Sequence, residues 1–354
     1  MRKKRGTTLR QWRRIAGIAL IVAVGWVGAA SAEPEKIYVA DEEANTVSVI
    51  DARLWTRSAV VPVGRGPHNV QVSPDGKLAW VTNNGEEPKE WEREHKGMAK
   101  REHEAMGNPG EVWAIDTAAD KVVVQVRVGL HPAHVVLTPD GRFAYVTNGG
   151  ESTVSVVDTQ ARRVAATIPV GASPHGIRLS PDGKEAYVAN LKGGTVSVID
   201  TEARREVATI PVGKGPAQVG FTPDGRLAFA SLSQEDRVVV IDPAARKVIK
   251  TVAVGTVPIQ VYATPDSRLL FVANQGTKRS PGTTVSVIDL GTFEVVKTVE
   301  TGPGAHGVVV SGDGRYAYVT NIYANSVSVI AVKDLSVVTT VPVGRGPNGI
   351  SVTP

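Results

Sequence analysis

Histidine is the residue type whose placement in this 354-residue chain points most directly to chemistry. Five of the seven histidines stand at or near the start of short valine-rich segments, and these are His68, His131, His134, His175 and His306. A neutral imidazole is a common metal ligand and a general acid or base near neutral pH. His68, His175 and His306 occupy the same position of an internal sequence repeat, which predicts that these three bind copper, iron or haem iron. The alternative is a repeat consensus in which each imidazole bonds a neighbouring loop.

The other two histidines lie in an insertion at residues 84–110 that interrupts the valine-rich pattern. Pro88 and the acids that follow it suit the start of a helix, and Gly107-Asn-Pro-Gly110 suits its end. On a helical wheel one face carries Trp91, His95, Met98 and Met106, with His103 at its edge. This pattern predicts an amphipathic lid helix. The spacing His-x-x-Met, which occurs twice, leaves a soft-metal site as the alternative.

The elements that must position these residues come from an internal repeat. A turn of the form Ser/Thr-Pro-Asp-Gly, with small variations, begins at Ser73, Thr138, Ser180, Thr222, Thr264 and Ser311, at intervals of 65, 42, 42, 42 and 47 residues. Each period holds four strand-like runs, such as "HGIRLS", "EAYVAN", "TVSVID" and "VATIPVG" in residues 175–213. Four short antiparallel strands per unit of about 40 residues are typical of a propeller blade.

Each strand type occurs seven times, so the sequence predicts an all-β, seven-bladed propeller over residues 33–354. The chain begins the pattern at a second strand, "KIYVAD", and ends on a lone first strand, "GISVTP". We therefore expect the last strand to complete the first blade and close the ring. Asp and Asn residues that recur at strand ends are expected to bond turn amides and to belong to the scaffold.

The recurring second strand carries a family resemblance. "YVTN" at 145–148 and 318–321, with "WVTN", "YVAN" and "FVAN" elsewhere, resembles the YVTN-type β-propeller repeat family over the whole mature chain. The resemblance implies the propeller fold. For function it implies only a range that includes exported binding and surface proteins and lactonase-like and haem-binding relatives.

Both departures from the 42-residue period fall between the second and third strands of a blade, after Asn83 and after Asn274. These loops share one face of a propeller with the connections between blades, which precede the innermost strands and hold His68, His131, His134, His175 and His306. This arrangement predicts a ligand-binding rim around the channel on that face. The beginnings of the inner strands contain no acid, which a lactonase-like site would need.

The N-terminus predicts export. A basic stretch and an apolar stretch precede Ala30-Ser31-Ala32, which is typical of a Sec-type signal peptide at 1–32 that is cleaved after Ala32. Removal of its seven Lys and Arg leaves 33 basic and 35 acidic residues, so nucleic acid is not an expected partner. No membrane-spanning segment is expected in the mature chain.

The composition narrows the function further. The absence of cysteine excludes disulfides, thiolate metal sites and covalent c-type haem, and no phosphate loop or nucleophile elbow is present. We expect a monomeric periplasmic or extracellular binding or scaffold protein, not an enzyme, whose histidine-bearing face meets a protein partner or small ligand. The alternatives are a metal- or haem-binding redox component and a lactonase- or lyase-like enzyme.

Overall fold

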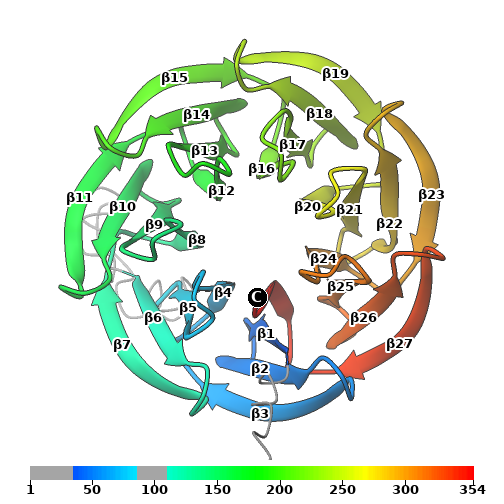
Figure 1. Cartoon of the computed structure of the whole chain (residues 1–354), viewed down its shortest axis with the longest axis horizontal. Helices are drawn as coiled ribbons and strands as arrows, with labels where there is room; N and C mark the ends of the chain where they lie inside the picture. The colour runs from blue at the N-terminus through cyan, green and yellow to red at the C-terminus, as the bar shows by residue number, and fades with distance from the viewer. Residues whose placement is uncertain (1–34, 86–109) are drawn as a thin grey trace, which may run out of the picture. The chain divides into compact units, whose positions relative to one another are not determined.

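The computed structural model describes residues 35–85 and 110–354, which form twenty-eight strands and no helix. The strands make seven four-stranded antiparallel sheets arranged in a ring around a central axis (Figure 1). The predicted signal peptide and the helical insertion, except for residues 84, 85 and 110, lie outside the described residues. Residues 35–85 and 110–354 contain no helix that is long and apolar enough to cross a membrane.

Blades one to four run as follows, from the innermost to the outermost strand. Blade one contains β28 (Pro347–Val352), β1 (Lys36–Asp41), β2 (Thr46–Asp51) and β3 (Thr56–Pro62); blade two contains β4 (Pro67–Val72), β5 (Leu78–Asn83), β6 (Glu111–Asp116) and β7 (Lys121–Arg127); blade three contains β8 (Pro132–Leu137), β9 (Phe143–Asn148), β10 (Thr153–Asp158) and β11 (Arg163–Pro169); blade four contains β12 (Pro174–Leu179), β13 (Glu185–Asn190), β14 (Thr195–Asp200) and β15 (Arg205–Pro211).

Blades five to seven follow the same plan. Blade five contains β16 (Pro216–Phe221), β17 (Ala228–Leu232), β18 (Arg237–Asp242) and β19 (Lys247–Ala253); blade six contains β20 (Pro258–Ala263), β21 (Leu269–Gly276), β22 (Pro281–Asp289) and β23 (Glu294–Glu300); blade seven contains β24 (Ala305–Val310), β25 (Tyr316–Asn321), β26 (Ser326–Ala331) and β27 (Ser336–Pro342). In blade six the longer loop extends the hairpin, so that Gly276 pairs with Pro281.

The ring closes between the first and last described strands. β28 pairs antiparallel with β1, and the amide of Thr353 donates to the carbonyl of Lys36 at 2.9 Å. The predicted seven blades, four strands per blade and closure are therefore confirmed. Closure matters energetically because β28 supplies the innermost strand of blade one, which would otherwise leave the edge of β1 unpaired.

The core lies between neighbouring blades and explains the alternating pattern. The tyrosine of the second strand is fully buried in four blades, at Tyr38, Tyr145, Tyr187 and Tyr318. The hydroxyl of Tyr145 donates to the carbonyl of Thr201 in the following blade at 3.0 Å, which satisfies its polar end and joins two blades.

The repeated Asp and Asn residues belong to the scaffold, as predicted. Asp158 ends a third strand, and its Oδ1 accepts the amides of Gln160 and Ala161 in the turn. The amide of Asn148, at the end of a second strand, donates to the hydroxyls of Thr153 and Ser155. The Asp bonds repeat in blades one to six and the Asn bonds in blades three, four, six and seven, so they build the ring; among the described residues the side chain of Asn83 has no such partner.

Candidate functional site

Every inner strand carries a β-bulge directly after its first residue. In blade four Pro174 pairs with Asn190 and Ile177 with Val188, so His175 and Gly176 together face only Ala189. The same break occurs in all seven blades, at the residue pairs 68–69, 133–134, 175–176, 217–218, 259–260, 306–307 and 348–349. A bulge frees side chains from the alternation of a regular strand and re-aims them. The bulges therefore direct two residues per blade toward the channel mouth.

In blades two, three, five and seven the residue that faces the bulge, the third of the YVTN motif, carries a hydroxyl that holds the bulge in place. Thr147 faces the bulge of blade three, and its hydroxyl accepts the amide of His134 at 2.9 Å. The same hydroxyl donates to the carbonyl of His175 in the next blade at 2.6 Å. Thr82, Ser231 and Thr320 form the same pair of bonds in their own blades. A buried hydroxyl thus fixes the backbone that carries the histidines and links it to the adjacent blade.

His68 and His175 meet across the channel mouth. Their Nε2 atoms are 3.1 Å apart, although the two residues belong to blades two and four. His175 Nδ1 lies 2.8 Å from the carbonyl of Ala217, which can only accept, so Nδ1 carries the hydrogen. In the neutral ring His175 Nε2 is therefore an acceptor, and His68 Nε2–H donates to it.

Glu42 adds a carboxylate beside this pair. Its Oε1 lies 3.6 Å from His68 Nδ1, and the Asn348 side-chain amide donates to its Oε2 at 2.6 Å. Burial acts to raise the pKa of Glu42, but hydrogen bonds and charge interaction with His68 and Asn348 outweigh it and lower that pKa to about 2. A charged acceptor therefore stands next to the imidazole of His68.

His134 completes the cluster. One ring nitrogen from each of His68, His134 and His175 lies within 4.8 Å of the others. His134 Nδ1 lies 3.3 Å from the amide nitrogen of Gln218, whose Oε1 in turn accepts the amide of Val219 at 2.9 Å. His134 Nε2 is buried without a hydrogen-bond partner among the described residues. An unpaired buried polar atom is costly, which marks this nitrogen as a position for a ligand.

The cluster favours neutral imidazoles. Burial, followed by the neighbouring histidines, lowers the pKa of His175 to about 4 and that of His306 to about 3. Burial also lowers the pKa of His134 well below its usual value. Neutral imidazole is the form that coordinates metals or accepts a proton. The burial of these rings thus prepares them for ligation.

The structure separates the five predicted rim histidines. His306 lies at the edge of the cluster, with its ring centroid 6.5 Å from that of His68. The metal set expected from the repeat was His68, His175 and His306, whereas the closest three are His68, His134 and His175. His131 is exposed, has a positive φ of 50° and does not belong to this cluster. The predicted lid residues Trp91, His95, Met98, His103 and Met106 lie outside the described residues.

The beginnings of the inner strands contain no acid, as expected, but an acid reaches the histidines from another strand type. Glu42 directly follows β1, the second strand of blade one, and reaches the mouth from there. At the same position the other blades have Asn84, Gly149, Leu191, Ser233, Gln275 and Ile322. Glu42 is the only acid among the residues that directly follow the seven second strands, and the sequence alone could have shown this.

Comparison with known proteins supports the propeller assignment and shows a spread of functions. A hydrazine synthase from Kuenenia stuttgartiensis is 25% identical, with a TM-score of 0.68, over 81% of this chain and 89% of that chain. The periplasmic gluconolactonase PpgL of Pseudomonas aeruginosa is 19% identical, with a TM-score of 0.69, over 90% of this chain and 99% of that chain; at this identity the likeness shows the fold alone.

Antigen Lp49 of Leptospira interrogans is 27% identical over 113 residues, which are 32% of this chain and 23% of that protein. The chain thus spans about a quarter of that curated relative. Residues 96–264 and 229–354 match the YNCE-like beta-propeller family, and together these ranges cover most of the ring. The chain therefore belongs to the YNCE-like β-propeller family.

Proposed function

We propose that this protein is an exported binding module that takes up a late first-row divalent ion such as Zn²⁺ or Cu²⁺ at the channel mouth. His68, His134 and His175 would be the ligands, and a fourth position would stay open to a small molecule or a partner's side chain. The observation that carries the proposal is the approach of His68 Nε2 to His175 Nε2 at 3.1 Å.

This distance suits two ligands of one ion. Two imidazole nitrogens at 2.0–2.1 Å from a tetrahedral ion are about 3.3 Å apart. Metal-binding histidines usually donate their other ring hydrogen to a carbonyl or carboxylate. Ala217 supplies a carbonyl to His175. His68 Nδ1 now lies 3.1 Å from the side-chain amide nitrogen of Asn348, a donor, so the Glu42 carboxylate at 3.6 Å would take over as its acceptor only after the hydrogen of His68 moves to Nδ1 and Asn348 gives way.

The geometry favours a bare ion over haem. A porphyrin occupies four positions of its iron and leaves two axial positions. Three imidazoles whose nitrogens converge within 4.8 Å supply one ligand more than those two positions accept. Export rests on the predicted signal peptide, and an exported site of this kind would capture its ion outside the cytoplasm.

The proposal predicts that metal binding depends on the imidazoles of His68 and His175. Full-length protein, freed of metal with a chelator and titrated with Co²⁺, is expected to develop the visible absorption of a four-coordinate site. Zn²⁺ at 100 times its Kd should stabilise the fold by about 2.7 kcal/mol. His175→Ala is expected to abolish both signals, and it introduces the residue that blades three and five carry at this position, Ala133 and Ala217.

His131→Ala is the matched control, because His131 is an exposed histidine outside the cluster. This variant should bind Co²⁺ and Zn²⁺ as the parent does. Co²⁺ absorption that survives His175→Ala and His68→Ala unchanged would contradict the proposal.

A lactonase-like hydrolysis is the second candidate function, and the presence of Glu42 beside His68 favours it. A carboxylate can hold an imidazole in the orientation that a general base requires. The expected result is hydrolysis of δ-gluconolactone above the spontaneous rate, reduced about 100-fold or more in His68→Ala. Proton release followed with a pH indicator measures it. Equal rates with the parent, with His68→Ala and with no protein would eliminate this candidate.

A further inference from the structure

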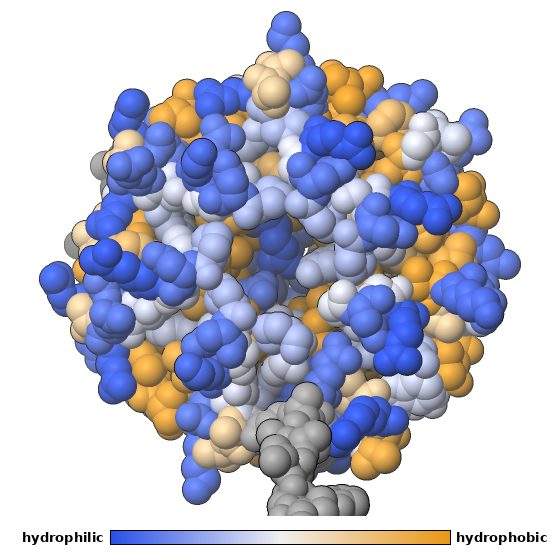
Figure 2. Space-filling view, in the orientation of Figure 1, coloured by the Kyte–Doolittle hydropathy of each residue, from blue (hydrophilic) through white to orange (hydrophobic). Residues whose placement is uncertain are grey.

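The channel contains a second layer of side chains below the histidines. This layer is formed by the fifth residue of each inner strand, and its members are Gln71, Val136, Arg178, Gly220, Tyr262, Val309 and Ser351. It lies between the bulges and the Pro-Asp-Gly turns of the opposite face. Figure 2 shows that the face in view is hollowed at its centre, where hydrophilic residues are visible inside the hollow.

Arg178 is the charged member of this layer. Its only hydrogen bond among the described residues is a long one, 3.4 Å from Nη1 to the carbonyl of Ile177. No carboxylate of residues 35–85 or 110–354 forms an ion pair with it. Burial lowers the pKa of Arg178, and Tyr262 acts in the opposite direction. A desolvated guanidinium without a counter-charge is unfavourable unless an anion joins it.

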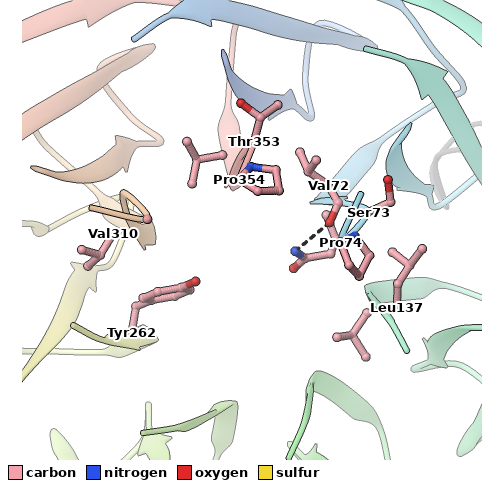
Figure 3. A pocket seen from close by; sticks show the side chains of 12 residues that line it. Val72, Ser73, Pro74, Leu137, Tyr262, Val310, Thr353 and Pro354 are labelled. Carbon is pink, nitrogen blue, oxygen red and sulfur yellow. Dashed lines mark hydrogen bonds between the residues drawn. The ribbon is translucent and has the colours of Figure 1, made fainter. Parts of the chain in front are cut away.

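Three other members of this layer, Gln71, Val136 and Tyr262, line a pocket of about 260 Å³ at the channel mouth opposite the histidines, whereas Arg178 belongs to the same layer but is not part of the pocket wall. In Figure 3 the Tyr262 ring projects into this pocket. The wall is mixed, with apolar Leu137, Val310 and Pro354 beside polar Gln71, Ser73 and Thr353. Gly220 has no side chain and stands between the Arg178 and Tyr262 positions in the sequence of blades. Arg178 and Tyr262 therefore stand at the same level of the channel, and Tyr262 also lines the hollow.

We propose that this end of the channel binds a small organic anion, with the carboxylate held by Arg178 and Tyr262 and the apolar body against Leu137 and Val310. Guanidinium recognises planar carboxylates through paired N–H donors, and the tyrosine hydroxyl supplies a further donor. An apolar wall with a few converging polar groups is typical of a small-molecule site. The site is independent of the metal proposed at the histidines.

Thermal unfolding with simple anions tests the proposal. Chelator-treated His175→Ala protein serves as the background, so that the histidine site does not contribute. Sodium benzoate is expected to raise its Tm in a saturable way, and benzyl alcohol, which lacks the charge, should not. Sodium phosphate separates the two sources of an oxyanion: a shift as large as that of benzoate would assign a free oxyanion, and a smaller shift would assign the carboxylate of an organic acid.

Arg178→Met in the same background keeps much of the side-chain volume and removes the charge. It is expected to lose the benzoate response and to unfold at a higher temperature than its parent without ligand, because an unpaired, half-buried charge is gone. Arg53→Met, at an exposed turn, should change neither quantity. The proposal is overturned if no anion shifts the Tm, or if Arg178→Met responds to benzoate as its parent does.

Discussion

Gln218→Glu is expected to tighten binding of Zn²⁺ at the channel mouth by about 10- to 100-fold, the usual range for partners of metal-binding histidines. To ligate an ion through Nε2, His134 must carry its hydrogen on Nδ1. That nitrogen now faces the amide nitrogen of Gln218, which also donates, at 3.3 Å. A glutamate would accept from both His134 Nδ1 and the Val219 amide. Competition with a chromophoric chelator measures the change in Kd.

Two controls make this test specific. Gln260→Glu introduces the same charge at the equivalent position of blade six, and it should leave the Kd nearly unchanged. Combining Gln218→Glu with His134→Ala should remove the gain, since the two residues act as a unit. If the higher Zn²⁺ affinity persists in the double variant, the introduced carboxylate acts only through its electrostatic field. That result would exclude His134 as a ligand.

The metal-free protein is expected to lose about 4 kcal/mol of folding stability between pH 6.5 and pH 5. Burial holds the pKa of His175 at about 4 and that of His306 at about 3, and that of His134 lies well below its usual 6.5. Below pH 6.5 the unfolded chain binds protons that these folded rings refuse, so stability falls with pH. Burial raises the pKa of Asp41 to about 6, so this group acts in the opposite direction and removes part of the loss.

His306→Asn isolates one contribution, because Asn348 fills the same position in blade one. Urea unfolding at a series of pH values should show that the free energy of unfolding falls by about 2 kcal/mol less between pH 7 and pH 5 in this variant, because its unfolded chain binds one proton fewer. The variant keeps the titratable groups near the His306 imidazole, including Glu42 and His68, so only one titrating group is removed. Parallel pH profiles for the parent and the variant would contradict the burial argument.

The fold was predictable because its signals are local and repeated seven times. The Pro-Asp-Gly turns, the alternation in "TVSVID" and the split blade each depend on residues a few positions apart, and the structure has all three. The scaffold role of the strand-end Asp and Asn residues was predictable for the same reason. Because each of the seven repeats carries these signals, each one supports the assignment of the repeat period independently.

The composition of the cluster was less predictable because it depends on contacts between blades. Alignment placed His134 one column away from His68 and His175, and a regular strand would send neighbouring columns to opposite sides. The bulge removes this distinction, so two adjacent columns reach the same space. Glu42 was missed because it arrives from a different strand type. Only the three-dimensional ring brings residues 42, 68, 134 and 175 together.

The bulges also bear on how such a ring can change its chemistry over evolutionary time. Two positions per blade are released from ladder pairing, while every blade keeps a buried aromatic residue in its second strand. Point substitutions there alter what the mouth presents without disturbing the architecture, as the mixture of His, Asn, Gln, Ala, Ile and Gly in these positions illustrates. The propeller thus keeps its backbone while the bulge residues vary, and these residues are suitable positions for combinatorial libraries aimed at new ligands.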